Sequence, residues 1–226
     1  MPLRAIVFDF DGVIANSEPL HCQAFQRVLA VEGLDLSESD YYGRYLGFDD
    51  VGAFRAMAAD RGVEWDARHV ATLVARKALM IEELEREGSI LFPGAADAIR
   101  RAAATVPVAV ASGAIGAEIR RTLDRERLTP LFAAIVAAED TFRSKPAPDP
   151  YILAVQRISA SLGSPLAAGE CVALEDSRWG LESARAAGLK TVAVGQTYDI
   201  NNLEADVAIP SIADLDLHTL AAIFCE

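Results

Sequence analysis

The sequence has few cysteines and no long apolar run. Its three cysteines, Cys22, Cys171 and Cys225, are odd in number and widely separated, which argues against a disulfide framework or a CxxC metal site. We expect reduced thiols that pack in the interior. The longest apolar run, 131–138, has eight residues, whereas about 20 are needed to cross a membrane. We therefore expect no membrane-spanning segment.

Basic residues are also scarce. The chain has 21 Lys and Arg against 33 Asp and Glu, a net charge of −12, and this excess of negative charge repels a polyphosphate backbone. We therefore expect no nucleic-acid partner. Residues 1–10 lack the long apolar segment of a secretory signal, so the expected location is cytoplasmic.

What the sequence does contain is typical of a folded enzyme-sized chain. Apolar residues make up 52% and charged residues 24% of 226 positions, which is globular usage. The length fits one core with a smaller insertion better than two full domains. We expect a monomer or a weak homodimer.

Short apolar runs recur along the chain, and most end abruptly in polar residues. Such runs predict strands that are buried on both faces of a parallel sheet. Helical spacing lies between them, as in Ile115, Ile119 and Leu123. The predicted fold class is α/β, a Rossmann-like doubly wound parallel sheet. The predicted strands are 5–8, 106–111, 133–137, 171–174, 191–194 and 207–209.

Residues 16–91 interrupt this alternation, because only helical patterns occur there. We predict an all-helical cap subdomain inserted into a core of residues 1–15 and 92–226. Since it enters directly after the first strand, it is placed to cover the loop at Asp9 and exclude water. The helical patterns cover 20–31, 51–60 and 66–87.

Asp9 and Asp11 follow the first predicted strand. Side chains two apart at a strand end share a face, so both carboxylates can point into one crevice. Repulsion raises one pKa and divides the pair into an ionised and a protonated group. Aspartate is charged at neutral pH and can attack phosphorus without a base. We predict that Asp9 is a nucleophile and Asp11 its acid/base partner.

Other strand ends supply the electrostatic parts that phosphoryl transfer requires. Ser112 and Gly113 offer a hydroxyl and open N–H groups at the start of a helix, an expected anion cradle. Lys145 offers a point charge in a Pro-rich loop. Glu175 and Asp176 complete with Asp9 an oxygen-rich cluster suited to Mg²⁺.

These motifs in this order resemble the four motifs of the haloacid dehalogenase superfamily over essentially the whole chain. The helical insertion is similar to that superfamily's C1 cap, and Ser17 to His21 resembles the branch of β-phosphoglucomutases and sugar-phosphate phosphatases. The motifs are Asp9-x-Asp11-Gly12-Val13, Val110-Ala111-Ser112-Gly113, Ser144-Lys145-Pro146-Ala147-Pro148-Asp149 and Leu174-Glu175-Asp176-Ser177-x-x-Gly180.

The resemblance implies a Mg²⁺-dependent phosphatase of a small phosphorylated metabolite, a sugar phosphate being one candidate, with an aspartyl-phosphate on Asp9. It implies that Mg²⁺ is held by the Asp9 carboxylate, the Asp11 backbone carbonyl and Asp176. Glu175 would also contact the ion, either directly or through a water molecule. The residues expected to bind substrate are Gly12, His21, Gly47, Lys77, Ser112, Gly113, Ala114 and Lys145.

Two cap positions bear on the choice between hydrolysis and mutase chemistry. Asp50 stands nearest to where glucose-phosphate mutases of this branch carry an arginine for the second phosphate, and an acid there would repel a bisphosphate. We therefore favour hydrolysis. Lys77 lies near the position of a mutase cap lysine, so an intramolecular phosphotransferase is the alternative, although Lys77 and His21 also fit an ordinary helix surface.

A non-enzymatic alternative is a receiver-type signalling domain, which also gathers acids, a hydroxyl and a lysine at strand ends. The order of these residues along the chain argues against it. In a receiver domain the acidic metal-binding pair comes before the acceptor, whereas here the predicted acceptor Asp9 comes first and the pair Glu175 and Asp176 comes late. The aromatic residues Trp65 and Trp179 are assigned to packing, and Tyr41, Tyr42 and Tyr45 to the core or a substrate pocket.

Overall fold

A computed structural model describes residues 2–45, 48–86 and 88–224, and the chain divides into two compact units. The first, called the core unit, is Met1–Asn16 with Ile90–Glu226, and the second, the helical unit, is Ser17–Ser89. The two connecting segments run together, because the Asn16 N–H donates to the Ile90 carbonyl at 2.7 Å. The chain thus leaves the core unit and returns to it at one place.

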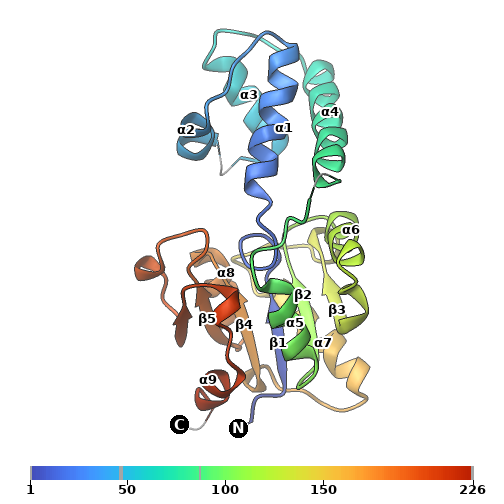
Figure 1. The fold of residues 1–226 in the computed structure, drawn as a ribbon, viewed down its shortest axis with the longest axis vertical. Coiled ribbons are helices and arrows are strands. Elements are labelled where there is room, and N and C mark those ends of the chain that lie inside the picture. The colour runs from blue at the N-terminus through green and yellow to red at the C-terminus, as the bar shows by residue number, and fades with distance from the viewer. Residues whose placement is uncertain (1, 46–47, 87, 225–226) are drawn as a thin grey trace. The chain divides into compact units, whose positions relative to one another are not determined.

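The core unit contains a parallel sheet of six strands in the order β3-β2-β1-β4-β5-β6 (Figure 1). The chain therefore starts in the middle, builds one side and then builds the other. Such a reversal creates a crevice between β1 and β4 at the carboxyl ends of the strands, where ligands bind in open α/β sheets. The α/β fold predicted from the apolar runs is confirmed. The strands are β1 Ala5–Phe8, β2 Val108–Ala111, β3 Phe132–Val136, β4 Cys171–Glu175, β5 Lys190–Val194 and β6 Val207–Ile209.

Three strands begin at residues other than those predicted, and one of them, β3, starts one residue early, at Phe132. β2 starts at Val108 and not at Val106, and Pro107 lies between, which lacks the N–H that a ladder needs. Its carbonyl still accepts from the Ile6 N–H at 3.1 Å. β5 starts one residue early, at Lys190, whose ammonium reaches Asp206 at 3.3 Å outside the sheet.

The core helices pack on the sheet through small and branched side chains. One apolar cluster joins residues of α7 and α8 to alternate residues of β1, β2, β3 and β4, as expected for strands whose side chains alternate between faces. Cys171 lies in this cluster as a buried free thiol. The helices are α5 Ala95–Ala103, α6 Gly116–Arg125, α7 Asp149–Leu162, α8 Arg178–Ala186 and α9 Leu217–Ala222.

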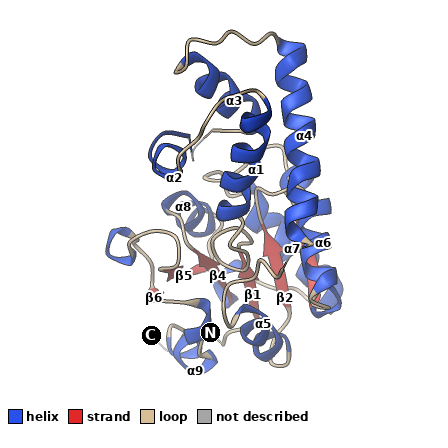
Figure 2. Cartoon of the chain, turned by 45° about the horizontal axis from the view of Figure 1, so that its top comes forward, coloured by secondary structure: helices blue, strands red, loops and turns tan. Residues whose placement is uncertain are grey.

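The helical unit consists of helices and loops in its described part (Figure 2). Asp49 and Asp66 cap α3 and α4 by accepting from backbone N–H groups of Gly52 and His69, which satisfies donors that a helix start leaves open. The unit has its own apolar core, against which Trp65 packs. The elements are α1 Glu18–Val31, α2 Glu38–Asp40, the π-helix η1 Tyr41–Tyr45, α3 Asp50–Ala59 and α4 Ala67–Glu85.

The predictions for the aromatic residues have different outcomes. Tyr41 and Tyr45 are buried in the core of the helical unit, whereas Tyr42 is exposed. Trp179, assigned to packing, is 56% exposed, so that prediction is wrong. The side chain stands in the first turn of α8, on a helix whose buried positions are Gly180, Leu181, Ser183 and Ala184.

In the described part of the chain, every helix is too short or too polar to span a membrane.

Candidate active site

Asp9 lies at the carboxyl end of β1, next to the end of β4. The register pairs Phe8 with Leu174, and the Asp9 N–H donates to the Leu174 carbonyl at 2.9 Å. Because Glu175 and Asp176 follow Leu174 directly, the strand pairing alone brings the three acids together. Carboxylate oxygens of Asp9, Glu175 and Asp176 all lie within 4.8 Å of one another, and all three residues are buried.

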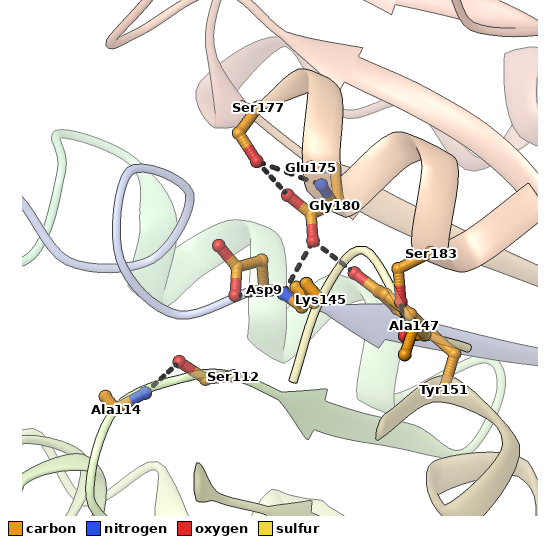
Figure 3. Close-up of polar contacts among 10 residues, drawn as sticks. All are labelled: Asp9, Ser112, Ala114, Lys145, Ala147, Tyr151, Glu175, Ser177, Gly180 and Ser183. Atoms are coloured by element: carbon orange, nitrogen blue, oxygen red, sulfur yellow. Dashed lines mark hydrogen bonds and ion pairs between the residues drawn. The ribbon is translucent and has the colours of Figure 1, made fainter. Parts of the chain in front are cut away.

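Lys145 joins this acidic cluster from the loop before α7 (Figure 3). Its Nζ atom donates to Asp9 Oδ1 at 2.7 Å and to Glu175 Oε1 at 2.6 Å. The Lys145 loop is itself tied to α8, because the Ser183 hydroxyl donates to the Ala147 carbonyl at 2.6 Å. The lysine is therefore fixed between the predicted nucleophile and an acid of the neighbouring strand.

Burial and mutual repulsion govern the charges of this cluster. Burial, followed by the charge of Glu175, raises the pKa of Asp9 well above its usual value. The same causes raise the pKa of Asp176 to about 7. Burial opposes the charge on Lys145, but the neighbouring carboxylates of Asp9 and Glu175 outweigh it and raise the lysine pKa. Lys145 is therefore an ammonium throughout the physiological range.

The donor set fits a hard divalent cation. When ionised, three carboxylates and one ammonium carry −3 + 1 = −2, which a divalent cation cancels. Without such a charge, burial and then the charge of Glu175 raise the pKa values of Asp9 and Asp176, so the ionised acids are disfavoured. Oxygen-only ligands of this kind suit Mg²⁺.

Two glycines allow the backbone to approach the acids closely. A Cβ on Gly180 would lie 1.9 Å from the Glu175 carboxyl carbon, and a Cβ on Gly12 would lie 1.9 Å from Asp176 Oδ2. Gly12 also has φ of +79°, a conformation that favours glycine. Gly12 thus makes room for Asp176, and its predicted contact with substrate stays a prediction.

Asp11 lies in the turn after β1, where it forms a bridge with Ala15. The cluster of carboxylate ligands contains Asp9 but not Asp11. The acid/base role of Asp11 and the ligand role of its carbonyl remain predictions from the sequence.

The predicted anion cradle after β2 is partly occupied by the chain itself. Ser112 is buried, and its Oγ accepts from the Ala114 N–H at 3.0 Å. Helix α6 starts at Gly116 and not at Ile115, and the Gly116 N–H donates to both carboxylate oxygens of Glu139, at 3.0 and 3.2 Å. Glu139, which the sequence did not point to, therefore takes up the Gly116 N–H, whereas the predicted anion contacts of Ser112 and Gly113 stay a prediction.

Three polar side chains meet inside the helical unit. Lys77, which is 1% exposed, forms an ion pair with Asp50 and lies 2.9 Å from His21 Nδ1. Its Nζ also lies 4.3 Å from the centre of the Phe25 ring. Burial, followed by the charge of Lys77, lowers the pKa of His21 to about 4. His21 is therefore neutral at pH 7.

This arrangement changes the interpretation of two predicted residues. Asp50 is the acid that was expected to repel a second phosphate, but Lys77 balances its charge. Lys77 is buried, so the alternative of a solvated helix face is wrong. Gly47, predicted to bind substrate, lies outside the described residues.

Comparison with known proteins places these motifs in a family. A family model described as haloacid dehalogenase-like hydrolase matches residues 6–194. The protein CbbY of Rhodobacter capsulatus is 36% identical over 225 residues, covering 94% of this chain and 95% of that protein. Fructose-1-phosphate phosphatase YqaB of Escherichia coli is 30% identical over 200 residues, covering 84% and 95%.

Solved structures agree with this assignment. CbbY from Rhodobacter sphaeroides in complex with phosphate is 28% identical and superposes with a TM-score of 0.76, covering 95% of this chain and 96% of that one. A mutant of the same protein in complex with xylulose-(1,5)bisphosphate is 27% identical, with a TM-score of 0.76 and the same coverage.

Proposed function

This chain belongs to the haloacid dehalogenase-like hydrolase family, and from that premise we propose that it is a Mg²⁺-dependent phosphatase of a small phosphorylated metabolite. The observation that carries the proposal is Lys145, whose ammonium contacts both Asp9 and Glu175 beside Asp176. A phosphorylated sugar is the favoured substrate class, because two of the relatives bear names or ligands of that kind.

Asp9 is the proposed nucleophile. One carboxylate oxygen attacks the phosphorus atom, and the bond from phosphorus to the substrate oxygen breaks as Asp11 donates a proton to that oxygen. Water then attacks phosphorus, Asp11 takes a proton from it, and the bond from phosphorus to Asp9 breaks. Free phosphate and the original Asp9 carboxylate result. Lys145 orients Asp9 Oδ1 and favours its ionised form.

Mg²⁺ would be held by Asp9, Asp176 and the Asp11 carbonyl, with Glu175 close by. When bound, it would neutralise the acids and stabilise negative charge on the phosphoryl oxygens. Ser112, Gly113 and Ala114 are proposed to contact the phosphoryl group. In the structure the Ala114 N–H donates to Ser112 Oγ, and the Gly116 N–H donates to Glu139.

The test is a panel of phosphorylated metabolites incubated with the purified protein, with Mg²⁺ or with a chelator. We expect free phosphate from at least one sugar phosphate with Mg²⁺, and none with the chelator. Both free phosphate and isomerised sugar phosphate are measured. Isomerisation with little free phosphate would instead identify a mutase. Phosphorylation that persists for minutes without turnover would identify a receiver-type domain.

Mg²⁺ should also stabilise the fold in a pH-dependent manner. Because the pKa values of Asp9 and Asp176 are raised, the folded protein binds protons more tightly than the unfolded chain between about pH 4 and pH 7. Without metal, stability therefore falls as the pH rises through this window. Cation binding requires ionised carboxylates, so Mg²⁺ should raise the unfolding midpoint more at pH 8 than at pH 5.

Thermal unfolding with and without Mg²⁺ at both pH values measures this effect. The variant Asp176→Asn should lose most of the stabilisation by Mg²⁺ at pH 8. An equal response to Mg²⁺ at the two pH values would contradict a site built from these acids.

A further inference from the structure

Tyr151 brings a polar group into the interior of the core unit. The residue is fully buried on α7, in the apolar cluster that α7 and α8 form with the sheet. Its hydroxyl donates to Glu175 Oε1 at 2.5 Å. A phenylalanine would fill the same space without a hydroxyl, and a buried hydroxyl is costly unless it is hydrogen-bonded. This hydrogen bond therefore indicates a role at Glu175.

Glu175 transmits this contact to the nucleophile (Figure 3). Its Oε1 atom accepts from Tyr151 at 2.5 Å and from Lys145 at 2.6 Å, and Lys145 donates in turn to Asp9 at 2.7 Å. The Lys145 ammonium also lies 5.2 Å from the centre of the Tyr151 ring. Both the hydroxyl and the ring of Tyr151 thus border the groups that hold Asp9.

The Glu175 carboxylate depends on such contacts for its orientation. It is fully buried and rests against Gly180, where no Cβ would fit. The contact to its other oxygen is weaker, because the Ser177 hydroxyl lies 3.4 Å from Oε2. The two short hydrogen bonds to Oε1 therefore fix the direction of the carboxylate.

We propose that Tyr151 is a positioning residue of the active site, whose hydroxyl holds Glu175 so that the Lys145 ammonium stays within hydrogen-bond distance of Asp9 Oδ1. This inference rests on the proposed phosphatase function for its kinetic consequence. Tyr151 does not touch the reacting atoms and acts through Glu175 and Lys145. Loss of the hydroxyl should misplace the ammonium when charge develops on the phosphoryl group, which affects kcat more than KM.

The test is the variant Tyr151→Phe, which keeps the ring and removes only the hydroxyl. We expect kcat with Mg²⁺ and p-nitrophenyl phosphate to fall by about 10-fold to 100-fold, the usual range for residues that orient a ligand or catalytic group, with KM changed by less than about threefold. Inhibition by orthovanadate, which adopts a five-coordinate geometry, should weaken by a similar factor. Inhibition by phosphate should not change.

Ile158→Val is the matched control, because Ile158 is a fully buried residue of the same helix and apolar cluster. It should lower stability slightly and leave kcat and both inhibition constants unchanged. A Tyr151→Phe enzyme with kcat within about twofold of the wild type would overturn the proposal. So would equal weakening of vanadate and phosphate inhibition.

A measurement without catalysis separates this inference from the proposed function. In a double-mutant cycle of Tyr151→Phe and Lys145→Met, the unfolding equilibrium constant of the metal-free double variant should differ by more than about twofold from the product of the two single effects. Additive effects would overturn the coupling of Tyr151 to Lys145. If the wild type released no phosphate but the cycle showed coupling, the proposed function would fail and the link from Tyr151 to Lys145 would stand.

Discussion

Asp9→Asn should reduce kcat for the hydrolysis of p-nitrophenyl phosphate by at least about 1,000-fold, because a neutral amide cannot take the place of the carboxylate nucleophile. The same change should not unfold the protein. Asparagine has the same shape, its Oδ1 can accept from Lys145, and it removes one of the repelling charges beside Glu175 and Asp176. We therefore expect unfolding without Mg²⁺ at pH 8 to occur at the same temperature as in the wild type or higher.

The steady-state rate and the unfolding midpoint are measured on the same preparation. Asp97→Asn is the control, since the Asp97 side chain is 74% exposed on α5 and its pair with Arg100 is a surface contact of 3.3 Å. It should keep the full rate. An Asp9→Asn protein with wild-type activity would exclude the proposed mechanism. An unfolded Asp9→Asn protein would contradict the expected stability, and its loss of activity would then result from unfolding and not from the missing nucleophile.

Lys145→Met should lower the free energy of unfolding by about 3–5 kcal/mol at pH 8 without Mg²⁺, the range for removal of one partner from a buried ion pair. The change leaves Asp9 and Glu175 as buried acids without their cation, and their side chains are only 10% and 0% exposed. Phosphatase activity should be lost as well, because the ammonium that orients the Asp9 carboxylate is removed.

The loss of stability should be smaller at pH 5 than at pH 8. The pKa of Asp9 is already raised in the wild type, and without the ammonium it should rise further, so Asp9 takes up a proton as the pH falls and the uncompensated charge disappears. Denaturant unfolding at both pH values measures the difference between variant and wild type.

Lys190→Met provides the comparison. Lys190 pairs with Asp206 at 3.3 Å, with side chains 40% and 30% exposed, and exposed pairs contribute at most about 1 kcal/mol. If the two lysine variants lost equal stability, or if the loss at Lys145 were independent of pH, the cluster around Asp9 would not be charged as described.

The fold and the acidic cluster were predictable because both depend on the order of apolar runs. A buried parallel strand has a continuous apolar sequence, and parallel strands end at one edge of the sheet. Asp9, Glu175 and Asp176 stand at such ends, so their proximity follows from topology. Lys145 stands out by its Pro-rich motif. The residues of the acidic cluster could thus be predicted without knowing how side chains pack.

Contacts between elements that the topology does not fix were missed. Tyr151 has the spacing of an ordinary buried helix residue, and its partner Glu175 is on β4. Glu139 reaches the start of α6 from the 3-10 helix Ala138–Asp140 after β3. Lys77 and Asp50 lie on different helices. Each of these pairs depends on how a helix or loop is rotated, which the apolar periodicity does not specify.

The hydrogen bond between Asn16 and Ile90 has an implication for engineering. Because the exit and re-entry points of residues 17–89 are joined at 2.7 Å, a two-residue or three-residue turn could replace the whole excursion without moving β1 or α5. Domain insertion is well tolerated where the two ends of the inserted segment lie close together. The junction is thus a natural splice point, at which helical units from other members of the family could be exchanged while the sheet and its chemistry are kept.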